Sequence, residues 1–472
     1  MRPLKKFLSF FQKTEFTARG GYLEIWQVAY PLIIMSASHT IMQFVDRKFL
    51  AARSTLEVSA AFSAGLLYFT MFCFFLATAN FTSAVVAQLF GAGQEKNCVR
   101  AAWSGAFFSL LSSLIILFVN PQIGRLIIDG SVPIPELAAM EKEYFSALAG
   151  SGVFCCMAAP FFAFFSGQGR TAPAAVINTA ACVLNILLDW LLIFGCRPLG
   201  LPELGVFGAG IATTLCTMFS MICIVTYFLL QNQQRFPTRK LRQPKFEYIR
   251  KLLRYGTPAG LQVFLDTGAF TLITYTIGCI SSEALGASVI ALSINNIFFM
   301  PLLGFSDANA IIVGQYIGRG RTGTATATAY RAWRMALLYM TGAAVLYIGF
   351  PDMLSRIFAP LDQSGGIDFP EVMRIARFIL FMVVAFNFFD ATKFIFTGAL
   401  RGAGDTLAVL LINSGGAWLI LAPGILLLVR HFHCGIHAVW LYMAGYALCE
   451  CLAILWRFRT GSWKKIKLIR QT

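Results

Sequence analysis

Charged residues are scarce in this 472-residue sequence. They make up 13% of the chain, against roughly 25% in soluble domains, whereas hydrophobic residues make up 57%. A soluble protein of this length could not cover its surface with so few charges. The apolar residues also form blocks of about twenty, the length at which a helix crosses a bilayer. Examples are Ala101–Val119, Ile211–Leu230 and Pro258–Ile280.

The apolar blocks also lack the alternation of a membrane β-barrel. Backbone in hydrocarbon must satisfy its own hydrogen bonds, so a spanning chain forms helices or a closed barrel. Barrel strands alternate apolar and polar residues over about ten positions, whereas these blocks are apolar all round. The sequence therefore predicts an all-α polytopic membrane protein.

Several catalytic motifs are missing. The sequence has no Gly-Lys dipeptide, which excludes a standard phosphate-binding loop and transport driven by the chain's own ATP hydrolysis. It also has no Gly-x-Ser-x-Gly and no His-Glu-x-x-His, so nothing indicates a hydrolase. We expect no enzyme activity and no cofactor. The 12 cysteines form no Cys-x-x-Cys pair and are expected to be free thiols, although a disulfide between Cys196 and Cys434 in outer loops is conceivable.

The positive charge is concentrated in three segments. The net charge is +16, and Met1–Leu23, Asn232–Gly256 and Arg457–Thr472 hold 19 of the 38 Lys and Arg residues. This pattern follows the positive-inside rule and predicts that all three segments are cytoplasmic. It argues against a nucleic-acid partner. Met1–Arg19 is basic and interrupted, so no cleavable signal peptide is expected.

The two halves of the chain repeat each other. Tyr30–Leu32 (YPL) resembles Thr257–Ala259 (TPA), and Val86–Gly91 (VAQLFG) resembles Val313–Gly318 (VGQYIG), and both pairs have the same offset along the chain. A third pair, SGQGRT at 166–171 and LRGAGDT at 400–406, has its matching glycines at a slightly larger offset. Such repeats predict two structurally equivalent lobes. Duplication also occurs in channels and membrane enzymes.

The repeats organise twelve expected spans. They are 24–48, 56–88, 101–119, 144–166, 174–195 and 206–231, then 257–280, 284–314, 333–350, 374–398, 406–429 and 437–456. We expect an N-lobe over 1–231, a basic cytoplasmic linker over 232–256 and a C-lobe over 257–472. Each lobe then crosses six times, so both termini are cytoplasmic.

These motifs resemble those of the MATE (multidrug and toxic compound extrusion) family, of the multidrug/oligosaccharidyl-lipid/polysaccharide exporter superfamily. The V-[AG]-Q-x-x-G and L-R-G-x-G-D-T elements occur once in each half, the latter degenerate in the first half. The resemblance covers roughly Leu23 to Lys465. It implies two six-helix lobes related by a pseudo-two-fold axis and forming a V. It also implies an antiporter that exchanges Na⁺ or H⁺ for small organic, often cationic, compounds.

Polar residues inside the first-lobe spans are candidate functional groups. A carboxylate in a span costs about 2.5–3.5 kcal/mol on insertion scales. Asp46 lies on the first span, and His39 lies two turns earlier on the same face. Asn185 and Asp189 are four residues apart on the fifth span, and Thr213 lies on the sixth. Their oxygens could replace the hydration shell of a hard cation or share a proton.

The resemblance assigns the first-lobe residues to a cation or proton site. They match an Asp near the outer end of span one and Asn-x-x-x-Asp on span five. The sequence departs from the family after Asp46, where Arg47 and Lys48 replace small or apolar residues. If Arg47 and Lys48 reach Asp46, they favour its ionised form, which favours Na⁺ as the coupling ion. The alternative is that both side chains snorkel to the membrane interface and leave Asp46 alone. A structural polar contact between helices is the alternative for the whole set.

The second lobe has acids of its own. Asp266 and Asp390 match two carboxylate positions of the NorM-like branch on spans seven and ten, where the first is generally Glu. Lys393 follows Asp390 by one helical turn and could simply neutralise it. Asp307 is a further acid in a span, with no family role that we can assign.

The remaining candidates are less specific. His431, His433 and His437 cluster in an expected outer loop, where histidines at a membrane interface are commoner than a metal site. The 45 Phe and 15 Met residues suit flat apolar cations, although most of them are expected to face lipid. Apart from Na⁺ at the coupling sites, no metal is expected.

The prediction is therefore a monomeric antiporter in a plasma (inner) membrane, in contact with the lipid bilayer. One rival is a flippase of lipid-linked precursors from the same superfamily, which commonly has fourteen spans and a more cationic cavity. Another is a membrane enzyme acting on lipids, which would need its catalytic residues at one bilayer surface. The sequence leaves open the substrate, the choice between Na⁺ and H⁺, and which lobe holds the dominant site.

Overall fold

The chain forms two compact units. The computed structural model describes residues 13–195, 200, 202–241, 243–357, 369–466 and 468–469. The unit called here the N-unit comprises 34–264 and 468–472, and the C-unit comprises 1–33 and 265–467. The borders fall inside two helices, α3 (Tyr22–Ala51) and α13 (Thr257–Gly278), which each contribute to both units. The boundaries of the N-lobe and the C-lobe, which were expected from the sequence at 1–231 and 257–472, remain predictions. Cys196 lies outside the described residues.

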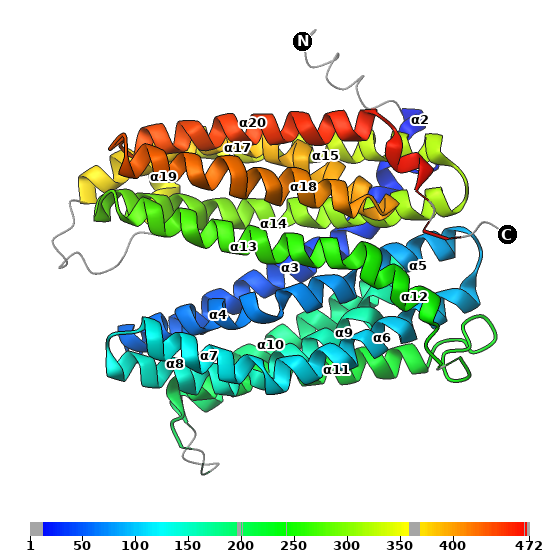
Figure 1. The fold of residues 1–472 in the computed structure, drawn as a ribbon, viewed down its shortest axis with the longest axis horizontal. Coiled ribbons are helices and arrows are strands. Elements are labelled where there is room, and N and C mark those ends of the chain that lie inside the picture. Colours follow the sequence, from blue (N-terminus) through cyan, green and yellow to red (C-terminus); the bar gives the residue numbers. More distant parts are fainter. Residues whose placement is uncertain are drawn as a thin grey trace, which may run out of the picture. The chain divides into compact units, whose positions relative to one another are not determined.

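Every regular element in the described part of the chain is helical (Figure 1). The N-unit adds to α3 the helices α4 (Thr55–Asn80), α5 (Thr82–Gly91), α6 (Glu95–Phe118), α7 (Asn120–Ser131), α8 (Pro135–Ala147), α9 (Ala149–Gly167), α10 (Ala172–Phe194), α11 (Gly205–Leu229), α12 (Phe246–Lys251) and the π-turn η2 (Leu252–Gly256). The C-unit contains α2 (Lys13–Phe16), α14 (Ser282–Gly318), α15 (Thr322–Gly349), α16 (Pro351–Ile357), α17 (Phe369–Ala403), α18 (Thr406–Gly416), the π-turn η3 (Ala417–Leu421), α19 (Ala422–Arg430), α20 (Ile436–Arg459) and the 3₁₀ turn η4 (Ser462–Lys465).

Eleven helical segments of the described residues are long and apolar enough to cross a membrane. They lie where eleven of the twelve expected spans lie, which confirms the polytopic all-α fold class. The seventh expected span is also helical, as the 22-residue α13. It is not among the eleven, and polar residues such as Gln262, Asp266 and Thr267 lower its hydropathy.

The internal repeat recurs in the backbone of the two units. Ser54 caps α4, accepting a hydrogen bond from the Leu56 amide at 3.1 Å. Ser281 caps α14 in the same way, accepting from the Ala284 amide at 3.0 Å. A hydroxyl at this position satisfies one of the amides that begin a helix without a partner. The two caps have the same offset along the chain as the first two motif pairs, so the sequence repeat is also a structural repeat.

Two glycine turns repeat in the same manner. Gly93 and Gly320 end the turns after α5 and α14 with φ of 72° and 71°. Gly169 and Gly404 do the same after α9 and α17 with φ of 77° and 92°. Side chains strain this left-handed backbone region, so glycine is the residue that stops each helix here. The repeated motifs thus set the ends of corresponding helices.

A second glycine of the repeated motif permits close helix packing. A Cβ atom on Gly167 would lie 2.7 Å from the Ser83 carbonyl oxygen, and one on Gly402 would lie 2.2 Å from the Ala310 carbonyl oxygen. Both distances are below contact, and in both cases the obstacle is backbone that cannot rotate away. The motif glycines therefore bring α9 against α5 in the N-unit and α17 against α14 in the C-unit.

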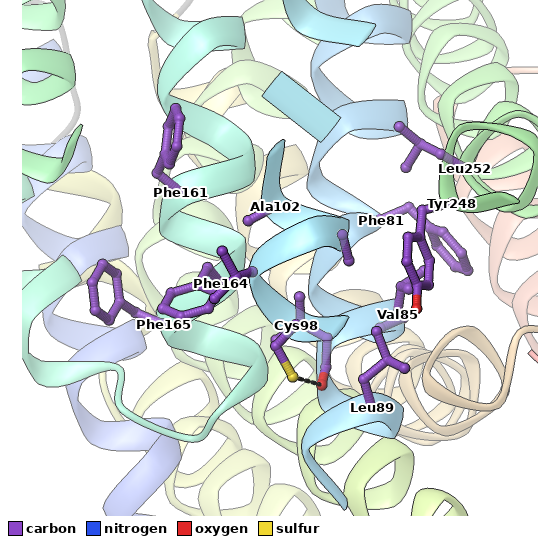
Figure 2. Packing of buried hydrophobic residues seen from close by; sticks show 14 of the residues in the cluster. Phe81, Val85, Leu89, Cys98, Ala102, Phe161, Phe164, Phe165, Tyr248 and Leu252 are labelled. Atoms are coloured by element: carbon purple, nitrogen blue, oxygen red, sulfur yellow. Dashed lines mark hydrogen bonds between the residues drawn. The ribbon is translucent and has the colours of Figure 1, made fainter. Parts of the chain in front are cut away.

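The N-unit has an aromatic core at one end. The Phe228 ring lies 4.9 Å from Phe161 and 4.8 Å from Phe164, centroid to centroid. Figure 2 shows this cluster around Cys98, whose thiol donates to the Val86 carbonyl. Tyr248 and Leu252, from the segment expected to be a linker, are buried in the same core. The basic segment thus packs as part of the N-unit.

The N-terminal segment packs inside the C-unit. The Glu15 carboxylate forms ion pairs with Arg331 at 3.4 Å and Arg334 at 3.2 Å, both on α15. The Tyr316 hydroxyl of α14 donates to the Glu24 carboxylate at 2.8 Å. These contacts join the first residues described to helices some 300 positions later in the chain. Conversely, Leu468 and Ile469 are buried in the N-unit core.

Candidate functional site

The N-unit places two carboxyl groups in contact within its helices. Asp46 lies near the end of α3, and Asp189 lies near the end of α10. Their side chains are within hydrogen-bonding reach of each other. Such a bond requires a proton on one of them, because two carboxylates offer only acceptors. The alternative is a cation that both oxygens bind.

The polar atoms around this pair are unsatisfied. Asp189 and Asn185 are fully buried, at 0% exposure. Within the described residues, no hydrogen bond reaches Asp46 Oδ1, either Asp189 oxygen, or either polar atom of the Asn185 side chain. Buried polar groups in proteins are normally paired, and an unpaired one costs about 1–3 kcal/mol. Four oxygens are therefore free to bind a monovalent cation or, in the carboxyl pair, a proton.

The surroundings of the pair come from three helices. Tyr144 of α8 lies within electrostatic range of both carboxyl groups. Cys182 of α10 lies within range of Asp46, and Cys216 of α11 lies near Asp189. Nothing in the sequence singled out Tyr144, because only packing in three dimensions brings it to the pair.

Two predicted members of this site make no hydrogen bond to the pair among the described residues. The Thr213 hydroxyl is half-buried and donates to the Ala209 carbonyl of its own helix at 3.1 Å. His39 is exposed on α3, and no hydrogen bond or ion pair of the described residues joins its ring to Asp46. Their predicted roles in coupling stay predictions, whereas Asp46, Asn185 and Asp189 form the site that the geometry supports.

The two cations that follow Asp46 lie on aromatic rings. The Arg47 guanidinium lies 5.4 Å from the Phe62 centroid, and the Lys48 ammonium lies 5.7 Å from the Phe44 centroid. Both side chains are exposed. No ion pair of the described residues joins either cation to Asp46. Arg47 nevertheless lies within electrostatic range of Asp46, so the choice between a cation that acts on the carboxylate and one that snorkels to the interface stays a prediction for Arg47.

The C-unit has a buried ion-pair network. The Lys393 ammonium lies 2.8 Å from Asp390 Oδ1 on the same helix, α17, which confirms the ion pair that their spacing allows. The ammonium also donates to Glu450 Oε2 of α20 at 3.1 Å. The side chains are 13%, 6% and 7% exposed for Lys393, Asp390 and Glu450. Asp390 and Glu450 are thus paired with a cation of the protein itself, the Lys393 ammonium.

Asp266 lies beside this network on α13. Its Oδ1 accepts a hydrogen bond from the Ser414 hydroxyl of α18 at 2.6 Å. Glu450 and Tyr446 of α20 are within electrostatic range of Asp266. The structure therefore brings Asp266 and Asp390 into one neighbourhood through α20. Glu450 was not among the residues predicted from the sequence, although a carboxylate in the last apolar run is itself a candidate because of the cost of inserting it.

Asp307 and the outer histidines do not join these sites. Asp307 is exposed on α14, with Arg401 within electrostatic range. His437 lies 4.4 Å from the Phe378 ring and His431 lies 5.0 Å from Phe432, centroid to centroid. Among the residues described, no three His, Cys, Asp or Glu side chains are grouped to hold a metal ion. His431 and His437 accordingly pack on aromatic rings.

Comparison with known proteins identifies the family of the chain. The MatE family model matches residues 31–191 and 258–426, one block in each half of the chain. A probable multidrug resistance protein NorM from Thermotoga maritima is 27% identical over 94% of this chain and 93% of its own. The multidrug resistance protein MdtK of Proteus mirabilis is 25% identical over 85% and 86% of the two chains.

Solved structures share the fold. A MOP superfamily transporter from Pyrococcus furiosus has a TM-score of 0.85 at 17% identity, covering 94% of this chain and 96% of its own. The outward-facing conformation of a multidrug resistance MATE transporter has a TM-score of 0.84, also at 17% identity and with the same coverage. Because the family model matches both halves, the chain belongs to the MATE family of membrane transporters.

Proposed function

We propose that this protein is a secondary exporter that exchanges Na⁺ or H⁺ for small organic compounds, many of them cationic. The observation that carries the proposal is the contact between Asp46 and Asp189, with Asn185 beside them and no protein donor for their oxygens among the described residues. A buried carboxyl pair without a donor requires a positive charge. The relatives described as multidrug resistance proteins support the class of substrate.

The coupling we propose is thermodynamic. The carboxyl pair binds its cation more tightly in one conformation of the transporter than in the other, and the exported compound has the opposite preference. Each ligand then shifts the conformational equilibrium by its differential affinity and drives the other across the membrane. We place the protein in a plasma (inner) membrane with both termini cytoplasmic, on the distribution of basic segments.

The test uses the full chain purified into liposomes, with efflux of a fluorescent organic cation followed under a Na⁺ gradient or a pH gradient imposed separately. We expect one gradient to drive efflux in the wild type and neither gradient to do so in Asp189→Asn. Asp129→Asn is the matched control, because Asp129 is 58% exposed and pairs with Lys142 on the surface of the same unit. Its efflux should equal that of the wild type.

Two outcomes would contradict the proposal. Full gradient-driven efflux by Asp189→Asn would remove the carboxyl pair from the mechanism. No gradient-driven efflux of any organic cation by the wild type would favour the flippase, and lipid-linked precursors would then be the substrates to try.

A further inference from the structure

Lys393 is a buried ammonium held between two helices. It lies between Asp390 of its own helix α17 and Glu450 of α20, at 2.8 Å and 3.1 Å. The same nitrogen lies 4.9 Å from the centroid of the Phe394 ring. Oxygens from two carboxylates and a ring face are the surroundings that a bound cation finds in a protein. The ammonium thus occupies the position in which a bound cation would contact both carboxylates.

The two units differ in where the positive charge comes from. In the N-unit, Asp46 and Asp189 lie together. Arg47 is within electrostatic range of Asp46, but no ion pair of the described residues joins either carboxyl group to a Lys or Arg. In the C-unit, Lys393 supplies the charge and is covalently tied to the site. A tethered cation cannot be exchanged for one from solution, and it keeps other cations away by repulsion.

Stabilisation alone is a weak explanation for this triad. A buried ion pair is often no more stabilising than apolar side chains of similar volume, because removing the charges from water costs as much as their attraction returns. The α17–α20 contact has apolar partners of its own, since Phe396 and Phe458 lie 4.7 Å apart, centroid to centroid. The charge on Lys393 therefore calls for a functional reason.

We infer that Lys393 is a specificity-determining residue that takes the place of an exchangeable alkali cation in the C-unit, so that removing its charge creates a Na⁺ site at Asp390 and Glu450. The inference rests on the proposed function, because it assigns the exchangeable ion to Asp46 and Asp189 alone. The inference also gives the C-unit carboxylates a role, because Asp390 and Glu450 hold the Lys393 ammonium where a metal cation would otherwise bind.

The test measures equilibrium binding of radioactive Na⁺ to purified full-length protein at fixed pH, with choline as the replacement cation. All samples carry Asp189→Asn, which removes one carboxylate of the N-unit pair and so destroys that site. We expect this background to bind no Na⁺, Asp189→Asn/Lys393→Met to bind about one Na⁺ per chain, and the further change Glu450→Gln to abolish that binding. Arg377→Met is the control, because Arg377 is an exposed partner of Asp352 and should add no site.

A second readout separates this role from a structural one. With a new site, the melting temperature of the Lys393→Met variant should rise by about 2–4 °C at Na⁺ concentrations well above the dissociation constant. A structural ion pair would lower the melting temperature equally in Na⁺ and in choline. Lys393→Gln keeps hydrogen-bond donors for both carboxylates without the charge, and serves if the Met variant does not fold.

Absence of Na⁺ binding in folded Lys393→Met or Lys393→Gln protein would overturn the inference. Na⁺ binding that survives Glu450→Gln would do so as well, because it would lie elsewhere. These measurements use no gradient and no exported compound. A failure of the wild type to exchange ions in liposomes would instead count against the proposed function, so the two results are distinguishable.

Discussion

The two units share a backbone plan and differ in their charges. Helix caps at Ser54 and Ser281 and left-handed turns at Gly93 and Gly320 recur at the same spacing. In the N-unit, however, no described Lys or Arg forms an ion pair with the carboxyl pair, whereas the C-unit ties its carboxylates to Lys393. Duplication thus kept the residues that end and pack helices. The intramembrane charges are free to diverge, because helix geometry does not depend on them.

A hydroxyl contact shows the divergence at one pair of equivalent positions. In the N-unit, Thr179 of α10 lies 3.1 Å from the Ser38 hydroxyl of α3. In the C-unit, Ser414 of α18, at the offset from Thr179 that separates the glycines of the third motif pair, donates to Asp266 of α13. The span pairs correspond, yet one contact is neutral and the other holds a carboxylate. Corresponding helix pairs therefore locate the sites, whereas the side chains at the contact determine what binds there.

The N-unit carboxyl pair is where substitution should have its greatest effect. Asp46→Asn or Asp189→Asn should abolish gradient-driven efflux, because a lone carboxyl can neither share a proton nor offer a cation the oxygens of both side chains. The double variant should be no worse than either single one, because each single change already destroys the pair. Gradient-driven efflux from liposomes measures this. Independent, additive losses would mean that the two carboxyls do not act together.

The next effect concerns the close approach of α17 to α14. Gly402→Ala forces a Cβ to within 2.2 Å of the Ala310 carbonyl oxygen, so we expect a loss of about 2–3 kcal/mol in the free energy of unfolding. Gly167→Ala should cost less, because its nearest atom lies 2.7 Å away. Gly415→Ala, with nothing within 4 Å, is the control and should be neutral. Melting in detergent ranks the three variants.

A smaller effect is expected at the charged residue of the third motif pair, which is Asp405 in the C-unit and Arg170 in the N-unit. Asp405 of the C-unit accepts two hydrogen bonds from Arg457, at 2.8 and 3.1 Å, whereas Arg170 at the equivalent N-unit position donates to Gln231 at 3.0 Å. Asp405→Asn should cost about 1–2 kcal/mol, discounted because Arg457 is 29% exposed. Gln231→Ala should cost under about 0.5 kcal/mol. Equal losses in thermal melts would contradict this ranking.

The smallest difference is expected at the repeated left-handed turns. Gly169→Ala and Gly404→Ala should each cost about 1–2 kcal/mol, since both place a side chain at a φ of 77° or 92°. We expect the two melting temperatures to fall by the same amount, because the same turn is strained in each unit. A clear difference between the two would indicate that one turn relaxes and the other does not.

The sequence predicts the fold and part of the site. Helix positions follow from apolar runs, and the repeats follow from glycine motifs that each have a local reason. Asn185 and Asp189 are placed together by four-residue spacing on one helix. Glu450 was missed because its partner Lys393 lies 57 residues away on another helix. Tyr144 and Ser414 were missed for the same reason, since spacing within a helix carries no information about which helices pack together.

The order of these contacts along the chain has a consequence for synthesis. The ribosome makes Glu15 and Glu24 before the N-unit helices, yet their partners Arg331, Arg334 and Tyr316 belong to helices made some 300 residues later. Leu468 and Ile469, made after the helices of both units, complete the N-unit core. The N-unit helices therefore insert while the beginning of the chain still waits for its own unit. Biogenesis must protect that early segment until the second half has entered the membrane.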